Sequence, residues 1–338
     1  MRIPSPDFRH LLSLRAPYGV FEHAEYATPR VEHGHCTDDV ARVLIVASRE
    51  PTPSEAVASF ARQAMDFLVL AQDPDGRSRN RRAATGAWLD TPTTNDCWGR
   101  SLWAFGTAVS HTSEPLLRDQ ARVAFTTGSA VRSPWPRAMA FAALGAVEIL
   151  SVEPTNESAR ALLVASAAML DRPDVAAQWC WPENRLTYAN AALPEALLAA
   201  GVTFGDDRLI DAALRQLRWL LASETVDEVL NVTPVGGVGR GEHRPQFDQQ
   251  PIEVAALADA CVRAWRVTND SMWGDALLRC VGWFMGLNAL GEPMYDETTG
   301  GGYDGLTARG PNRNQGAEST LALLATLQQA RRVTSVVS

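Results

Sequence analysis

Carboxylates recur in this sequence where long polar stretches give way to apolar ones. Cleavage of a glycosidic bond needs two carboxyl groups, one as an acid and the other as a base or nucleophile. The distance between the two groups decides between retaining and inverting chemistry. We predict as catalytic candidates Asp38, Asp248, Asp304 and Glu318.

Two of these carboxylates lie in residues 296–327, where a glycine-rich loop runs into an apolar helix. The glycines at 300–302 favour a turn whose backbone could approach a ligand closely, just before Asp304. Glu318 lies about one turn into the helix, where an unpaired charge would be costly. It therefore either acts as a general acid or pairs with an arginine such as Arg313.

A second set of polar and aromatic residues follows the same helix starts. A pyranose has an apolar face and hydroxyl edges, which suits such a mixture. One polar cluster ordinarily caps a helix, but recurring clusters with extra glutamines and a glutamate need other partners, which a polyol would supply. For each tryptophan, the alternative is a place in the core. The predicted substrate-binding residues are Asp39, Asp96, Trp98, Trp181, Glu183, Tyr188, Asn190, Gln249, Gln250, Glu253, Tyr303, Asn314 and Gln315.

Other chemistries have weaker support, and we predict neither a metal nor a cofactor. His33, His35 and Cys36 lack the second paired cluster of a metal site. The glycine-rich run at 236–239 lacks the lysine and hydroxyl residue of a phosphate loop. A basic run in the first long loop is either solvated or contacts an anionic sugar, and it comprises Arg77, Arg79, Arg81 and Arg82.

Composition excludes several classes of protein. The chain has 338 residues and a net charge of -8. Lysines and arginines are scattered, which argues against nucleic-acid binding. No apolar run reaches the length of about 18 residues needed to span a membrane. The N-terminus lacks a long apolar region, and the five cysteines form no C-x-x-C pair. We therefore expect a cytoplasmic protein with free thiols.

The elements that must position these residues are helices of two alternating kinds. Helices rich in small apolar residues alternate with more amphipathic ones, which is typical of stacked helical hairpins. The first apolar helix is predicted to begin with Thr37 as its N-cap. We expect apolar helices beginning at Thr37 and at residues 94–96 and spanning 134–150, 188–200, 251–265 and 315–330, and amphipathic helices at 54–71, 113–127, 156–170, 206–222 and 270–287.

Six such pairs would close a ring, with a short helix at 7–14 as the sixth outer member. We predict an all-α fold, an (α/α)6 toroid in a single domain of residues 1–338, in which residues 1–36 lead into the first helix. The long connections at 72–93, 171–187, 224–250 and 288–314 would all lie on one face. Long loops without helix are usually functional, so this face is predicted to carry the site.

Several motifs resemble a bacterial family of six-hairpin proteins. They are YGVFEHA, HGHCTDDVAR, NDCWGRSLWAFG, LTYANAALPEALLAAG, QFDQQPIEVAAL, GGGYDGL and NQGAESTLALL. Members of this family occur alone or attached to glycosyltransferase domains. The toroid is more distantly similar to N-acylglucosamine 2-epimerases and unsaturated glucuronyl hydrolases. The resemblance covers nearly the whole chain and implies a carbohydrate-active protein.

These observations together predict a glycoside hydrolase that acts on an oligosaccharide. A sugar epimerase is the alternative enzyme, but the similar epimerases use histidines as acid and base. Only His33, His35 and His243 fall in the predicted rim loops. A second alternative is a glycan-binding module without catalysis, which would serve a partner glycosyltransferase.

Overall fold

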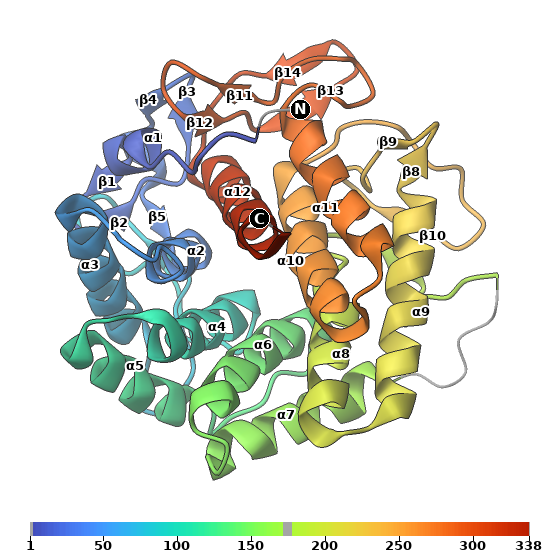
Figure 1. Cartoon of the computed structure of the whole chain (residues 1–338). Helices are drawn as coiled ribbons and strands as arrows, with labels where there is room; N and C mark the ends of the chain where they lie inside the picture. The colour runs from blue at the N-terminus through green and yellow to red at the C-terminus, as the bar shows by residue number, and fades with distance from the viewer. Residues whose placement is uncertain (1–2, 172–177, 338) are drawn as a thin grey trace.

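A computed structural model describes residues 3–171 and 178–337 of the chain. Within these residues, six long helices form an inner ring around an axis, as Figure 1 shows. Alanines and other small apolar residues cover most sides of these helices, which are buried almost all round. The inner helices are α2 (Thr37–Ser48), α4 (Asp96–His111), α6 (Pro136–Val152), α8 (Ala192–Phe204), α10 (Pro251–Thr268) and α12 (Ala317–Val337).

The outer ring covers the inner one and is more amphipathic. Each outer helix buries one face against inner helices and exposes the other to solvent. The short helix α1 contacts α12, as predicted for the sixth outer position. The outer helices are α1 (Arg9–Ser13), α3 (Glu55–Ala71), α5 (Pro115–Gly128), α7 (Glu157–Leu170), α9 (Asp207–Ser223) and α11 (Ser271–Phe284). The predicted six-hairpin toroid is therefore confirmed.

Helices α4 and α6 approach each other especially closely because glycines lie at their crossing. A β-carbon at Gly145 would stand 2.2 Å from the carbonyl oxygen of Leu102. One at Gly106 would stand 2.2 Å from the carbonyl oxygen of Gly145, and one at Gly99 would stand 2.2 Å from that of Ala138. Backbone therefore packs on backbone, which narrows the inner ring at this point.

The long connections carry short antiparallel hairpins. One further turn is a 3-10 helix at Val31–His33. The strand pairs are β1 (Arg15–Ala16) with β2 (Gly19–Val20), β3 (Ala24–Glu25) with β4 (Thr28–Pro29), β5 (His35–Cys36) with β6 (Arg81–Arg82), β7 (Arg185–Leu186) with β10 (Val238–Gly239), β8 (Thr225–Val226) with β9 (Val229–Leu230), β11 (Tyr295–Asp296) with β12 (Gly301–Gly302), and β13 (Gly305–Thr307) with β14 (Gly310–Asn312).

The ring closes where the first and last parts of the described chain meet. The backbone N–H of Gln315 donates to the carbonyl of Tyr26 at 2.9 Å, and that of Ala317 donates to the carbonyl of Glu22 at 3.0 Å. His10 Nε2 lies 2.8 Å from the carbonyl oxygen of Gln315. Residues before α2 therefore build the wall beside α12 and do more than lead into the first helix.

Two local predictions about helix starts were wrong. Cys36, not Thr37, is the N-cap of α2, and its sulfur accepts the N–H of Asp39. The Thr37 hydroxyl donates instead to the carbonyl of Arg79 at 2.6 Å. Helix α8 begins at Ala192, because the preceding residues form a turn in which Ala189 has a φ of 43°. No helix in the described ranges is long and apolar enough to cross a membrane.

Candidate active site

A polar cavity opens at the N-terminal ends of the inner helices. Its empty space measures about 1110 Å³, including the open mouth. Acids and arginines line most of its wall. They come from α2, α4 and α12, from the hairpin segments around residues 22 and 81, and from the loop before α12, while the loops before α8 and α10 contribute a tyrosine and a glutamine. The lining includes Glu22, His23, Asp38, Asp39, Arg42, Arg81, Asp96, Arg100, Tyr188, Gln250, Asp304 and Glu318.

Asp38 and Arg100 face each other across this cavity from the first turns of α2 and α4. Asp38 Oδ1 lies 3.1 Å from Arg100 Nε, and the exposed fractions of the two side chains are 18% and 5%. The two opposite charges are close enough to form an ion pair, but the two atoms do not meet in hydrogen-bonding geometry. Neither atom has another hydrogen-bond partner within the described residues. Burial raises the pKa of Asp38, against the opposing charges of Arg100 and Arg42. A partly exposed carboxyl that holds its proton more tightly suits a general acid.

Arg42 pairs with two carboxylates, and the second of them ties α2 to α12. Its Nη1 donates to Asp39 Oδ1 at 2.5 Å, and its Nη2 lies 2.7 Å from Glu318 Oε2. Asp39 also accepts a hydrogen bond from the Cys36 thiol at 3.1 Å and is almost fully buried. Asp39 therefore supports the structure, whereas the Glu318 side chain is 40% exposed and faces the cavity. Glu318 thus pairs with an arginine, as one of its two predicted roles required, but that arginine is Arg42 and not Arg313.

Asp96 and Tyr188 form a second polar pair on the wall. The Tyr188 hydroxyl donates to Asp96 Oδ2 at 2.7 Å, which links the start of α4 to the loop before α8. Burial raises the pKa of this phenol, and the neighbouring charge of Asp96 adds to the effect. Both residues and Gln250 line the cavity, and their role in substrate binding stays a prediction.

Asp304 lines the cavity but is used mainly to hold the start of α12. Its Oδ1 accepts the N–H of Gly316 at 2.8 Å and the hydroxyl of Ser319 at 2.9 Å. The expected approach of the glycines to a ligand was wrong. Gly302 packs on α12 instead, where a β-carbon would stand 2.5 Å from the carbonyl oxygen of Ser319.

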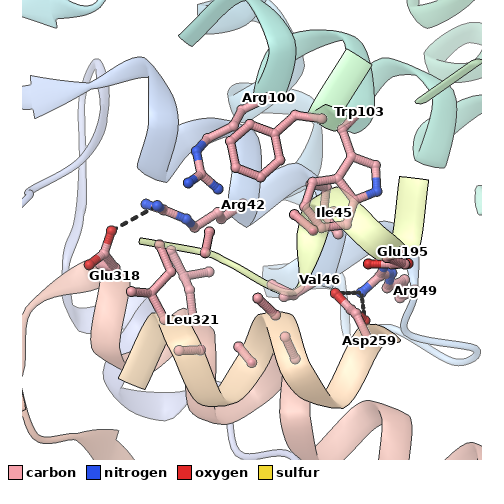
Figure 2. A pocket seen from close by; sticks show the side chains of 18 residues that line it. Arg42, Ile45, Val46, Arg49, Arg100, Trp103, Glu195, Asp259, Glu318 and Leu321 are labelled. Carbon is pink, nitrogen blue, oxygen red and sulfur yellow. Dashed lines mark hydrogen bonds and ion pairs between the residues drawn. The ribbon is translucent and has the colours of Figure 1, made fainter. Parts of the chain in front are cut away.

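Below this cavity lies a second, mostly apolar one, shown in Figure 2. It shares Arg42, Arg100 and Glu318 with the upper cavity, so the two are continuous along the axis. On one wall, the rings of Trp103 and Phe141 are stacked at 6.0 Å. The guanidinium of Arg100 lies over Phe141 at 3.9 Å. This cation–π contact fixes the direction in which Arg100 faces the cavity.

Buried ion pairs form the deep end of the lower cavity. Arg49 Nη1 donates to Asp259 Oδ1 at 3.0 Å, and Arg263 Nε donates to Glu195 Oε1 at 3.0 Å. Burial raises the pKa of Glu195 to about 7. A ligand that enters from the mouth would thus meet charged groups first, then apolar side chains, and charged groups again at the floor.

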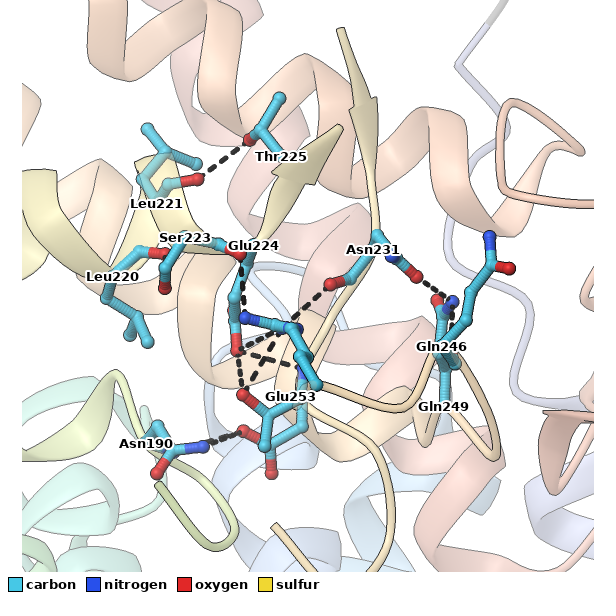
Figure 3. A network of polar contacts seen from close by, with 12 residues as sticks. Asn190, Leu220, Leu221, Ser223, Glu224, Thr225, Asn231, Gln246, Gln249 and Glu253 are labelled. Atoms are coloured by element: carbon cyan, nitrogen blue, oxygen red, sulfur yellow. Dashed lines mark hydrogen bonds and ion pairs between the residues drawn. The ribbon is translucent and has the colours of Figure 1, made fainter. Parts of the chain in front are cut away.

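Three predicted binding residues are buried in a network beside the cavity, which Figure 3 shows. The Glu253 carboxylate accepts the N–H of Ala189 and, at 3.0 Å, the side-chain amide of Asn190. Gln249 Oε1 accepts the indole N–H of Trp283 at 2.9 Å, and Gln249 also bonds Asn231. Glu253 and Asn190 therefore hold the turn that presents Tyr188, whereas Gln249 holds the segment before α10, and none of the three is among the residues that line the cavity.

The Glu253→Gln variant should change how stability depends on pH. Burial, reinforced by the nearby charge of Glu224, raises the pKa of Glu253 from 4.5 to about 8. A carboxyl with a raised folded-state pKa stabilises the fold fully below its unfolded pKa, and this contribution is lost as pH rises towards 8. We expect the unfolding free energy of the wild type to fall by at least about 1 kcal/mol from pH 5 to pH 8 relative to the variant.

Urea denaturation at several pH values measures this difference. The amide of the variant offers one hydrogen-bond acceptor fewer, which changes its stability at every pH. The readout is therefore the slope of the unfolding free energy against pH, and not its absolute value. A matched control is Glu228→Gln, whose side chain is 94% exposed. The control should run parallel to the wild type. Parallel curves for Glu253→Gln as well would show that this carboxyl does not titrate in that range.

The remaining predicted residues lie away from the cavity. Trp98 is fully buried and donates its indole N–H to the carbonyl of Gly128 at 2.9 Å. Trp181 is buried and stacks on Trp219 at 6.1 Å. Both are core tryptophans, so their expected contact with sugar was wrong.

Four more predicted residues are not among those that line the cavity. Asp248 is exposed in the loop before α10, and Tyr303 packs partly on the core. Asn314 Oδ1 accepts the N–H of Tyr26 at 2.9 Å. Gln315 is buried and accepts the Thr299 hydroxyl at 2.6 Å. Asn314 and Gln315 therefore hold the loop before α12. Glu183, by contrast, lines a groove next to the cavity.

The basic run separates into arginines with different surroundings. Arg81 reaches the cavity and pairs with Glu22. Arg82 lies over the rings of Tyr18, Phe67 and Trp88 at 4.7 to 5.6 Å. The two others pair locally with acids, Arg77 with Asp75 and Arg79 with Asp73. Only Arg81 of this run is therefore placed to contact a ligand in the cavity.

One group in the described residues has the spacing of a metal site. Ligand atoms of Glu22, Cys36 and Asp39 lie within 4.8 Å of one another. Burial raises the pKa of Cys36 well above its usual value, which keeps the thiol protonated. Arg81 and Arg42 already pair with the two carboxylates. Both carboxylates are already neutralised by these arginines, so the cluster offers no free carboxylate to a cation and we assign no metal here.

Sequence reasoning missed two of the three arginines of the cavity, Arg42 and Arg100. Arg42 follows Asp38 by four residues, and Arg100 follows Asp96 by four residues. Residues four apart lie on the same face of a helix, so this repeated spacing was the available signal. Glu22 and His23 carried no comparable signal, because their place depends on how the first hairpins fold back on α12.

Comparison with known proteins gives structural relatives only. No model of a known protein family matches the chain, and no curated protein matches it. A cellobiose 2-epimerase from Spirochaeta thermophila superimposes with a TM-score of 0.68 and 13% identity, over 97% of this chain and 93% of that one. A GH76 α-mannanase from Bacteroides thetaiotaomicron gives 0.64 and 8%, over 96% and 93%. A cellulase from C. cellulolyticum in complex with cellobiose gives 0.63 and 9%, over 94% and 88%.

The fold is the (α/α)6 toroid. This is the architecture that the sequence resemblance implied, and the toroids that match it include sugar epimerases and glycoside hydrolases. Neighbours in this fold are thus carbohydrate-processing enzymes. At identities of 8 to 13% the likeness concerns the fold alone, and the chemistry of this toroid depends on the residues of its own cavity.

Proposed function

We propose that this toroid is a glycoside hydrolase that cleaves a glycosidic bond in an oligosaccharide. The observation that carries the proposal is the meeting of carboxyl groups from three inner helices in one cavity. Asp38, Asp96 and Glu318 lie in the first turns of α2, α4 and α12, and all three line it. Glycosidic cleavage by an acid and a second carboxylate needs such a convergence.

The surroundings of each carboxyl suggest its role. Asp38 has a raised pKa because it is largely buried, so it is the general acid that protonates the leaving oxygen. Glu318 is more exposed and carries an ion pair with Arg42, so it is the base or nucleophile. Asp96, Tyr188 and Gln250 offer hydrogen bonds to sugar hydroxyls from the same wall.

Sugar epimerisation is the second candidate, and one observation favours it. His23 lines the cavity together with the carboxylates, and an imidazole is the commonest group for moving a proton near neutral pH. However, an epimerase that uses histidines as both acid and base needs a second imidazole. His23 is the only histidine among the lining residues of the upper cavity in the described chain, and the lower cavity is lined by none. The residues of the cavity therefore favour hydrolysis, while the structural neighbours include both sugar epimerases and glycoside hydrolases.

A panel of oligosaccharides and monosaccharides incubated with the protein in D2O tests the proposal. We expect new reducing ends, detected by chromatography, from at least one β-glucan or mannan fragment. A changed monosaccharide that carries deuterium at the epimerised carbon would establish epimerisation instead. Tight binding without turnover would indicate a glycan-binding module, as expected if the chain serves a partner glycosyltransferase.

A further inference from the structure

A second groove adjoins the cavity on the side of α4 and α6. The two spaces share Arg81, Asp96 and Tyr188 on their linings. Beyond this boundary the groove is lined by polar residues of the loop before α4, by Glu183, and by the segment that leads into α6. A ligand that fills the cavity could therefore continue into the groove past Tyr188.

The groove carries an exposed tryptophan. All ten tryptophans of the chain fall in the described residues, and Trp135 is the only one that is largely exposed, at 58%. It stands between Pro134 and Pro136, which restrict its backbone. Its N–H donates to the Ser133 hydroxyl oxygen at 3.1 Å, and its carbonyl accepts the N–H of Met139 at 3.1 Å. The indole is thus presented on a fixed backbone.

The polar residues opposite are equally fixed. Arg137 Nη1 lies 2.8 Å from the Glu183 carboxylate, and its Nη2 donates to Asn190 Oδ1 at 3.0 Å. The Arg137 guanidinium also lies over the Tyr188 ring at 4.9 Å, while the hydroxyl of that tyrosine is held by Asp96. Tyr188 is therefore a rigid divider between the groove and the cavity.

We propose that this groove is a subsite for a second sugar residue, with Trp135 as its stacking platform. This inference rests on the proposed function, because it places the first sugar in the cavity beside Asp38 and Glu318. A pyranose would lay its apolar face on the indole, since aromatic faces attract weakly polarised C–H groups. Its hydroxyl edge would meet Glu183 and Arg137. The substrate class is therefore an oligosaccharide of at least two residues, and a monosaccharide would leave the groove empty.

Calorimetric titration with glucose, cellobiose and cellotriose, and with mannose, mannobiose and mannotriose, tests the subsite. We expect the wild type to bind the di- or trisaccharide of one series at least about ten-fold more tightly than its monosaccharide. The Trp135→Ala variant should lose that gain and keep its affinity for the monosaccharide. Trp135→Tyr should recover much of it, because a tyrosine ring still offers an aromatic face.

The matched control is Leu116→Ala, which removes an apolar side chain that is 86% exposed on α5. It should bind like the wild type. Equal affinity for monosaccharide and oligosaccharides, or an unchanged gain in Trp135→Ala, would overturn the subsite and leave the proposed function standing. Failure of every sugar, here and on an array of immobilised glycans, would overturn both.

Discussion

Asp38→Asn should lower the turnover number at least about 100-fold on the substrate found in the sugar panel. The amide keeps the shape of the side chain but cannot donate a proton to the leaving oxygen. Glu318→Gln should have an effect of similar size, because it removes the second carboxylate of the pair. The rate of hydrolysis at saturating substrate, measured by release of reducing ends, gives both values. Circular dichroism and thermal melting check that each variant remains folded.

Asp248→Asn is the matched control for these variants. Asp248 was predicted beside the other carboxylates but is exposed outside the cavity, so its amide should keep near-full activity. Asp304→Asn should act mainly on stability, because this carboxylate holds the start of α12. Near-full activity in both Asp38→Asn and Glu318→Gln would show that these two carboxyl groups are not the catalytic pair.

Gly145→Ala should destabilise the fold by about 3 kcal/mol or more. The added methyl group would press on the backbone oxygen of Leu102, which cannot rotate away as a side chain can. Helices α4 and α6 would have to separate, and overpacking of this kind in a core costs about 1–3 kcal/mol even where side chains can adjust. Urea denaturation of the purified variant measures the loss.

Gly274→Ala is the control, since Gly274 lies in α11 and no heavy atom stands within 4 Å of its missing β-carbon. Alanine favours the helix over glycine, so this variant should gain about 0.5–1 kcal/mol. A loss at Gly274 similar to that at Gly145 would mean that close packing is not the cause.

The architecture could be predicted from the sequence because the inner helices are apolar on nearly every side. Such helices must be buried, and their alternation with amphipathic helices leaves few arrangements other than a ring. Helix starts were less certain. Tyr188 was placed in α8, yet Ala189 adopts a positive φ and Glu253, far along the chain, binds the turn. A contact between distant residues cannot be predicted from a local pattern.

The acids of the candidate site could be predicted from the sequence, but the way in which its residues are arranged could not. The helix starts with clustered carboxylates did lead to Asp38, Asp96 and Glu318. The sequence pattern could not separate a tryptophan on the groove from one in the core, because both stand beside polar residues. Trp98 was chosen and is buried, while Trp135 was overlooked and is exposed. Whether a tryptophan is buried depends on which helices and loops the closed toroid packs around it.

Closure of the ring also determines when the site comes into being. His10 and Gln315 touch although they are 305 positions apart in the chain, and Glu318 reaches Arg42 only after α12 has docked beside α2. Contacts between such distant positions form slowly, because a long stretch of chain must be ordered first. The proposed catalytic pair therefore exists only once α12 has docked beside α2. A sugar bound between α2 and α12 would stabilise the closed ring, because it binds only when these two helices lie side by side.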